Sequence, residues 1–316
     1  MAGMAFRRPY LPYFFERKKA IFHEKSGIRS WEWRILFFLY ASLTTSAIKN
    51  RPSFIGPFFI LTKKNLLPDG LRFSTFFFMT ARPFRAKVQQ IRHLTPEIRE
   101  MTLEMIEPVS LSYQAGQSIA VTVPGASSSS PLRRYFSLAS PPRSSKHLVL
   151  LLNSQDRGKG SAFLLKNDIG DEVQISGPYG SFLLQHEPHK ELLFIGTGTG
   201  VAPLWSMMAT LLEESCSQPM KLLWGLRSEL DRYYVQELEA WKTQHENFSY
   251  VLTLSKPSAA WRGKKGRVTD LLQEISTVDH MAAYVCGNRA MVKEVNDLLK
   301  EKGDCAIYQE RHSETL

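Results

Sequence analysis

Cysteine is scarce in this sequence. The 316 residues contain only Cys216, Cys286 and Cys305, too few for a disulfide framework or for a zinc or iron–sulfur site that takes four cysteines from this chain. No two of them are closely spaced, so we expect a reducing compartment. The composition, with 43% hydrophobic and 22% charged residues, excludes a collagen, a disordered tail protein and a multi-span membrane protein.

Acidic residues are scarce in the first quarter of the chain. Residues 1–80 contain 13 Lys/Arg and 4 Asp/Glu, whereas residues 81–316 contain 27 and 26. The net charge of +10 therefore belongs almost entirely to a basic, aromatic extension. Because the rest of the chain is nearly neutral and has no RNA-binding, helix-turn-helix or zinc-finger signature, we expect no nucleic-acid partner.

The extension also has no long hydrophobic run. Its longest apolar stretch, residues 35–48, is interrupted by hydroxyl residues and is shorter than the roughly 20 residues of a membrane span. Three alternatives are open: a segment that is absent from a working enzyme starting at Met79, a membrane-surface anchor, or an organelle presequence. Unless the extension is an anchor or a presequence, we expect the protein to be cytoplasmic.

The middle of the chain reads as strands. Six short β-branched or alternating runs, separated by turn residues, predict an antiparallel barrel. The runs are residues 88–93, 99–105, 119–123, 135–139, 148–152 and 173–176. A serine run at 127–130 predicts an exposed loop.

A group of side chains in the fourth run suits a flavin nucleotide. Arg134, Tyr135, Phe136 and Ser137 follow one another. Arginine can pair with a phosphate, an aromatic ring can lie against a flat ring, and serine can donate a hydrogen bond. The alternative is an edge strand with a surface arginine.

Two glycine-rich turns follow. Gly160 and Ser161 precede a helix-like stretch, where free backbone N–H groups can face a phosphate, and residues 177–180 predict a tight turn after a strand. Each could equally be a plain turn, so their order along the chain carries more information than either alone.

The last third of the chain predicts a nucleotide-binding α/β unit. The apolar run 192–195 leads into Gly196-Thr197-Gly198-Thr199-Gly200 and then a helical stretch to about residue 212. A strand, a glycine turn and a helix together place a pyrophosphate at a helix N-terminus. The spacing differs from the common G-x-G-x-x-G fingerprint, and the alternative is a plain strand–helix turn.

Strands and helices continue to alternate, which predicts a doubly wound parallel sheet. The predicted strands are 221–225, 248–254, 282–286 and 306–309, and the predicted helices are 231–241, 268–274 and 289–300. Ligands bind such sheets at the carboxyl ends of the strands, where residues 196–200, 225–227 and 286–288 lie. Four cations near strand ends are candidates for a 2′-phosphate: Arg227, Lys256, Lys265 and Arg267. Each could also be a solvated surface residue, and Cys286 could be a small core residue.

The order of these motifs resembles the ferredoxin–NADP⁺ reductase family over about residues 82–316. The shared pattern is Arg-x-(Tyr/Phe)-Ser, Gly-x-x-Ser, Gly-Pro-x-Gly, Gly-Thr-Gly-Thr-Gly-x-Ala-Pro and Cys-Gly. Within the family the chain looks most like the bacterial ferredoxin/flavodoxin–NADP⁺ reductases. Residues 286–292 and 266–272 are similar to their Cys-Gly-(Asn/Ser)-x-x-Met and Gly-Arg-(Leu/Val/Ile)-Thr-Asp stretches, and Glu310 falls where they carry a glutamate.

The resemblance implies a six-stranded FAD-binding barrel at residues 81–186 and an NAD(P)-binding domain at 187–316. It implies that Arg134 holds the FAD pyrophosphate, Phe136 lies against the isoalloxazine and Ser137 hydrogen-bonds near its N5, with Tyr135 beside them and Gly160 and Ser161 at the phosphates. On the NAD(P) side it implies Thr197, Gly198, Thr199 and Gly200 at the nicotinamide and pyrophosphate, Cys286 and Gly287 near hydride transfer, and Arg227 and Arg267 at a 2′-phosphate. Cys286, Ser137 and Glu310 are the expected catalytic residues, and no metal is expected.

Three positions depart from the family pattern. Phe136 stands where many members have tyrosine, Lys256 stands where arginine is common, and residues 311–316 include no aromatic to cover the flavin. We expect an FAD-dependent oxidoreductase that moves electrons between a nicotinamide nucleotide, NADP(H) or NAD(H), and a carrier, ferredoxin or flavodoxin. We expect the protein to be a monomer. The alternatives are an NAD(P)H:flavin reductase or the reductase component of an oxygenase, a nucleotide-sensing scaffold without turnover, and a redox protein tethered to a membrane by residues 1–80.

Overall fold

The computed structural model describes residues 83–124, 132–155, 158–185, 187 and 190–310, together with two short strands, β1 (Leu66–Leu67) and β2 (Gly70–Leu71). The chain divides into two units, Met1–Met79 and Thr80–Leu316. In the first unit, β1 and β2 form an antiparallel pair. The expectations for the rest of residues 1–80, for the loop at 127–130 and for residues 311–316 fall outside the described residues. Within the described part of the chain, no helix is both long and apolar enough to cross a membrane.

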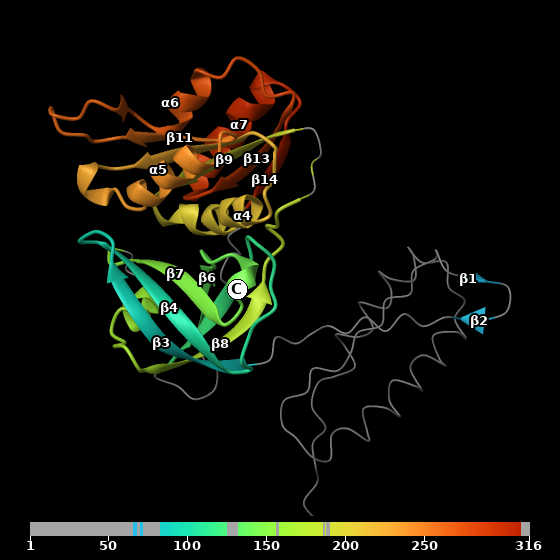
Figure 1. Ribbon diagram of the computed structural model, residues 1–316, viewed down its shortest axis with the longest axis vertical. Helices are drawn as coiled ribbons and strands as arrows, with labels where there is room; N and C mark the ends of the chain where they lie inside the picture. Colours follow the sequence, from blue (N-terminus) through green and yellow to red (C-terminus); the bar gives the residue numbers. More distant parts are fainter. Residues whose placement is uncertain are drawn as a thin grey trace, which may run out of the picture. The chain divides into compact units, whose positions relative to one another are not determined.

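The first half of the second unit is a six-stranded antiparallel sheet, as the sequence predicts (Figure 1). Its neighbouring strands run in the order β6-β5-β8-β3-β4-β7. The strands are β3 (Pro83–His93), β4 (Ile98–Glu107), β5 (Ser118–Val123), β6 (Leu132–Ser137), β7 (His147–Asn153) and β8 (Glu172–Tyr179). Alternate residues such as Met101, Leu103 and Met105 of β4 are buried in the core that the sheet encloses, because successive side chains of a strand point to opposite faces.

The turn predicted at residues 177–180 is only partly correct. Strand β8 continues through Tyr179, which pairs with Ser118 of β5, and only Gly180 leaves the strand. An irregularity in the β5–β8 register between Ser118 and Ala120 accommodates this extension. Pairing with β5 therefore decides where β8 ends, which the local Gly-Pro signal could not indicate.

The second half is a six-stranded parallel sheet with helices on both faces, again as predicted (Figure 1). Its order is β12-β11-β10-β9-β13-β14. The strands are β9 (Glu191–Thr197), β10 (Met220–Leu226), β11 (Phe248–Leu254), β12 (Lys264–Lys265), β13 (Met281–Cys286) and β14 (Ala306–Gln309). The strand order reverses direction between β9 and β13, so a crevice is expected at their carboxyl ends.

Alternation along the strands assigns each face of this sheet to different helices. Leu193, Ile195 and Val285 pack with α6 (Val268–Gln273) and α7 (Arg289–Lys302). The opposite face, with Phe194 and Trp224, packs with α4 (Val201–Glu213). The same cluster includes barrel residues of β4 and β7, so α4 lies between the sheet and the barrel (Figure 1).

The helix predicted to begin at residue 231 begins later. A short 3-10 turn covers Glu229–Asp231, and α5 spans Val235–Gln244. Between them Tyr234 adopts a left-handed conformation with φ of 56°, which side chains with a Cβ rarely adopt. Tertiary contacts of Tyr233 and Tyr234, described below, account for the interruption.

Candidate active site between the barrel and the parallel sheet

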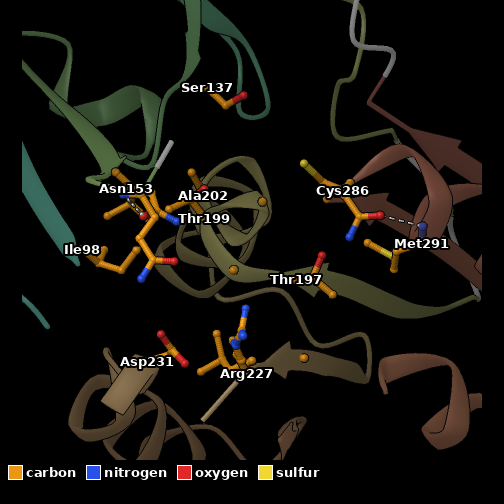
Figure 2. Close-up of a pocket in the computed structure, with 18 of the residues that line it drawn as sticks. Ile98, Ser137, Asn153, Thr197, Thr199, Ala202, Arg227, Asp231, Cys286 and Met291 are labelled. Atoms are coloured by element: carbon orange, nitrogen blue, oxygen red, sulfur yellow. Dashed lines mark hydrogen bonds between the residues drawn. The ribbon is translucent and has the colours of Figure 1, made fainter. Parts of the chain in front are cut away.

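A cavity of about 760 Å³ lies at the carboxyl ends of β9, β10 and β13, with β6 and α3 (Lys159–Leu164) of the barrel half on its other side (Figure 2). Its lining contains the site residues that the sequence predicts, except two of the four 2′-phosphate candidates. From the barrel half come Arg134, Tyr135, Phe136, Ser137, Gly160 and Ser161, and from the sheet half Thr197, Gly198, Thr199, Gly200, Arg227, Arg267, Cys286, Gly287 and Glu310. Lys256 and Lys265 are not part of the lining.

The barrel wall depends on a close approach of α3 to β6. A Cβ on Gly160 would lie 2.6 Å from the Cβ of Arg134 and 3.1 Å from Cζ of Phe136, distances that only glycine avoids. Arg134 makes one hydrogen bond among the described residues, to the carbonyl of Arg133 at 2.9 Å, so most of its donors are available to a ligand. Tyr135 is half exposed and lies edge-on to Tyr179 at 5.4 Å between ring centroids.

The sheet wall is a glycine turn packed against the end of β13. A Cβ on Gly200 would lie 2.8 Å from both the carbonyl oxygen of Cys286 and the Cα of Gly287. Gly198 has φ of +53°, in the left-handed region that glycine adopts readily. Because these contacts are with backbone, the turn can approach β13 this closely only without side chains.

Two buried aromatic residues fix this turn through hydrogen bonds. The carbonyl oxygen of Gly198 accepts hydrogen bonds from Nε1 of Trp224 at 3.2 Å and from the hydroxyl of Tyr233 at 3.0 Å. Neither residue belongs to a motif that the sequence shows. Trp224 read as an ordinary strand residue and Tyr233 as part of a helix, and no local pattern indicates that both reach a turn about 26 to 35 residues earlier.

Glu310 lines the cavity and joins its two halves. Its carboxylate accepts from the Oγ of Ser137 at 2.6 Å and from the Sγ of Cys286 at 2.8 Å. Cys286 is 1% exposed, and this burial, followed by the charge and hydrogen bond of Glu310, raises the pKa of its thiol well above the usual range. The thiol is therefore protonated and acts as a donor.

The two predicted arginines of the sheet half differ in their surroundings. Arg267 pairs with Glu294 of α7 through Nη1 and Nη2 of its guanidinium, at 3.0 and 2.7 Å. The side chain of Arg227 has no hydrogen bond or ion pair with the residues that the structure describes. Asp231 also lines the cavity, and its Oδ2 accepts from the N–H and Oγ of Ser228 at 2.8 and 2.7 Å. Of these two arginines, Arg227 is thus the one available to an anion.

These residues fit a flavin and a nicotinamide nucleotide. The cavity volume falls within the range of ligand sites, and glycines keep both walls open where a Cβ would collide. Arginine side chains supply charge for phosphates on each side. The cavity spans the barrel and the switch point of a parallel sheet, where a dinucleotide can lie against the glycine turn.

Comparisons with known proteins agree with this fit. Residues 85–183 match an oxidoreductase FAD-binding domain family, and residues 194–297 match an oxidoreductase NAD-binding domain family. Ferredoxin–NADP reductase B of Sorangium cellulosum is 31% identical over 229 residues, covering 70% of this chain and 92% of that protein. This chain belongs to the ferredoxin–NADP reductase family. It is accordingly an FAD- and NAD(P)-binding oxidoreductase, as its motifs predict.

Two further proteins are similar to this chain. The reductase component DmpP of phenol 2-monooxygenase from Pseudomonas is 30% identical over 214 residues, which cover 66% of this chain and 59% of that protein. The structure of a ferredoxin–NADP⁺ reductase from Neisseria gonorrhoeae with bound FAD and NADP superimposes with a TM-score of 0.63 at 21% identity, covering 72% of this chain and 99% of that one. The latter comparison shows the shared fold, with the antiparallel sheet followed by the parallel sheet.

Proposed function

We propose that this reductase transfers electrons between NADPH and a one-electron carrier protein, ferredoxin or flavodoxin. The observation that carries the proposal is the pair of hydrogen bonds that Glu310 accepts from Ser137 and Cys286. They bring one residue of the flavin-type motif and one of the nicotinamide-type motif to a single carboxylate. A site that joins these two motifs suits a reaction between two ring systems bound face to face.

On the barrel side, Arg134 would hold the FAD pyrophosphate, with Gly160 and Ser161 at the phosphates and Tyr135 at the cavity wall. Phe136 would lie against the isoalloxazine, and Ser137 would hydrogen-bond near its N5. When bound, the flavin supplies the exchange between a hydride, which carries an electron pair, and single electrons. We propose residues 81–186 as the domain that performs this binding.

On the sheet side, residues 187–316 would bind NAD(P)H. Thr197, Gly198, Thr199 and Gly200 would contact its pyrophosphate and nicotinamide, with Gly287 beside them and Cys286 next to the position of hydride transfer. The protonated thiol and Glu310 would orient the nicotinamide and exclude water. No general acid or base is required for hydride transfer itself, so the roles of Cys286, Ser137 and Glu310 are to position and to stabilise.

Preference for NADPH would depend on Arg227. A free guanidinium can pair with a 2′-phosphate in bidentate fashion, whereas Arg267 would first have to leave Glu294. The second candidate function is an NADH-dependent reductase component of an oxygenase or a flavin reductase. Asp231 favours it, because a carboxylate in the cavity can accept a hydrogen bond from a ribose 2′-hydroxyl and repels a phosphate.

Anaerobic mixing of the purified full chain with NADPH, and separately with NADH, tests both readings through the visible flavin band. Much faster bleaching by NADPH supports the first proposal, and faster bleaching by NADH supports the second. A colourless protein, or a flavin that neither nucleotide bleaches, contradicts both and favours a nucleotide-sensing scaffold. Salt dependence of electron output then separates a protein carrier, which docks electrostatically, from free flavin.

We propose a monomer that works in the cytoplasm, with residues 1–80 either outside the working enzyme or acting as a surface anchor or targeting segment. Fractionation of cells that express the full chain or a form starting at Met79 distinguishes these cases. Membrane recovery of the full chain alone would support the anchor. Equal recovery of both forms in the cytosol would contradict it.

A further inference from the structure

Two adjacent tyrosines before α5 reach the two halves of the enzyme. The Tyr233 hydroxyl donates to the carbonyl of Gly198 in the glycine turn, at 3.0 Å. The Tyr234 hydroxyl donates to Oε2 of Glu100 on β4 of the barrel. Tyr233, Tyr234 and Glu100 are 4%, 6% and 7% exposed, so all three are withdrawn from water, where a hydrogen bond is costly to lose.

Tyr233 influences how the glycine turn presents its backbone. In a trans peptide the C=O and the following N–H point in opposite directions. Anchoring the Gly198 carbonyl to Tyr233 and Trp224 therefore fixes the direction of the Thr199 N–H as well. Thr199 lines the cavity, so the anchor sets the orientation of a donor at the proposed pyrophosphate site.

Tyr234 belongs to a network that ties the sheet half to the barrel. Glu100 also accepts from Nη1 of Arg92 at 3.1 Å, and Nη2 of Arg92 reaches Glu237 of α5 at 3.3 Å. The Tyr234 ring stacks on Trp205 of α4 at 4.2 Å. Burial and the charge of Glu100 raise the pKa of Tyr234, which keeps the hydroxyl protonated as a donor.

The backbone between the two rings departs from the helix that the sequence predicts. A non-glycine residue at φ of 56° is unfavourable unless its surroundings impose it. Here the two hydroxyls have fixed partners about 100 residues apart in the chain, Glu100 and Gly198. The left-handed residue lets consecutive side chains reach both.

We propose that Tyr233 and Tyr234 are positioning residues: Tyr233 shapes the phosphate-binding turn, and Tyr234 with Glu100 holds that turn at a fixed place relative to the flavin barrel. The proposal rests on the proposed function, because the turn is the proposed nucleotide site. It separates two effects. Loss of the Tyr233 hydroxyl should weaken nucleotide binding, whereas loss of the Tyr234 hydroxyl should slow hydride transfer at an unchanged affinity.

The experiment compares Tyr233→Phe and Tyr234→Phe in the full-length flavoprotein, with Tyr250→Phe as the matched control. Tyr250 of β11 donates to Glu239 of α5 and does not line the cavity. Calorimetric titration with NADP⁺ and with NAD⁺ gives the dissociation constants, and stopped-flow reduction gives the limiting rate. Tyr233→Phe should raise the dissociation constant about two- to tenfold, the range for one lost hydrogen bond, with a limiting rate within about twofold of the wild type.

Tyr234→Phe should leave the dissociation constant unchanged and lower the limiting rate severalfold. Glu100→Gln keeps an acceptor for Tyr234 but loses the charge that pairs with Arg92, so it should lower the limiting rate by less than Tyr234→Phe. It replaces Tyr234→Phe as the test if that variant does not fold. Wild-type affinity in Tyr233→Phe, or a wild-type rate in Tyr234→Phe, overturns the proposal. Equal losses of affinity in both variants also overturn it, because they would indicate general loosening.

Hydrogen exchange separates failure of this proposal from failure of the proposed function. If the wild type is not reduced by either nucleotide, the proposed function fails. The positioning roles still require faster amide exchange around residues 196–201 in Tyr233→Phe and in β4 in Tyr234→Phe. Unchanged exchange at both segments overturns them.

Discussion

Ser137 at the end of β6 and Cys286 at the end of β13 donate to opposite oxygens of one carboxylate, that of Glu310, at 2.6 and 2.8 Å. Ser137 and Glu310 are 173 residues apart in sequence, and the two donors belong to different sheets. A charge-assisted hydrogen bond is stronger than a neutral one. The pair therefore links the barrel to the parallel sheet at the place where both cofactor rings are proposed to lie.

Replacing Glu310 with glutamine should lower the limiting rate of flavin reduction by about tenfold. The amide keeps the size of the side chain but removes the charge that both donors meet, and such bonds contribute about 1.5–3 kcal/mol. Stopped-flow reduction measures the rate, and Glu301→Gln, on the exposed face of α7, is the control. A rate equal to that of the wild type would remove Glu310 from the catalytic group.

Cys286 should be the slowest of the three cysteines to react with iodoacetamide. Burial and Glu310 raise the pKa of its thiol, and the thiolate is the reactive form, whereas Cys216 and Cys305 are partly exposed. Peptide mass spectrometry after timed alkylation at pH 8 gives the three rates, with urea-unfolded protein as the control in which all three react. Modification of Cys286 as fast as Cys216 would contradict the buried, protonated thiol.

Arg227→Ala should lower kcat/KM for NADPH, relative to kcat/KM for NADH, by about tenfold or more. The reason is that a hydrogen bond between a guanidinium and a charged phosphate contributes about 1.5–3 kcal/mol. Arg267→Ala should have a smaller effect, since Glu294 already pairs with that guanidinium. Steady-state kinetics with both nucleotides measures the ratios. A larger effect at Arg267 would mean that its pair with Glu294 opens when the nucleotide binds.

Gly200→Ala should destabilise the fold by about 1–3 kcal/mol, the usual cost of overpacking. The added Cβ would meet the backbone of Cys286 and Gly287 at 2.8 Å, and backbone cannot rotate away as a side chain can. Urea unfolding measures the loss. Gly158→Ala is the control for stability, because its Cβ would have no heavy atom within 4 Å; an equal loss in both variants would contradict the close approach.

Stability should fall as pH rises from about 10 to about 12. Burial raises the pKa of Tyr113 from its usual value of 10 to about 12, so the folded state holds this proton more tightly than the unfolded state. The contribution is complete below pH 10 and is lost as pH rises to 12. Urea titrations across this range measure the slope, and Tyr113→Phe, which loses three bonds to Ser140 and Pro141, should be less stable at pH 8 but show a shallower slope.

The sequence by itself determined the two architectures and the motif residues that line the cavity. Period-two runs and strand–helix alternation indicated the antiparallel and parallel sheets. Local motifs such as 134–137, 158–161 and 196–200 identified their cavity residues, because a turn that must approach a phosphate or a neighbouring strand needs glycine at a fixed place in the local sequence.

The tertiary structure alone decided which distant side chains meet. The carboxylate of Glu310, the carbonyl of Gly198 and the carboxylate of Glu100 each take donors from segments far along the chain. No periodicity encodes such pairs, since they depend on how elements that are distant in the chain pack together. Pairing with β5 extended β8 to Tyr179, and the contacts of Tyr233 and Tyr234 delayed α5 to Val235, because long-range hydrogen bonds outweigh the weak local preference of a few residues.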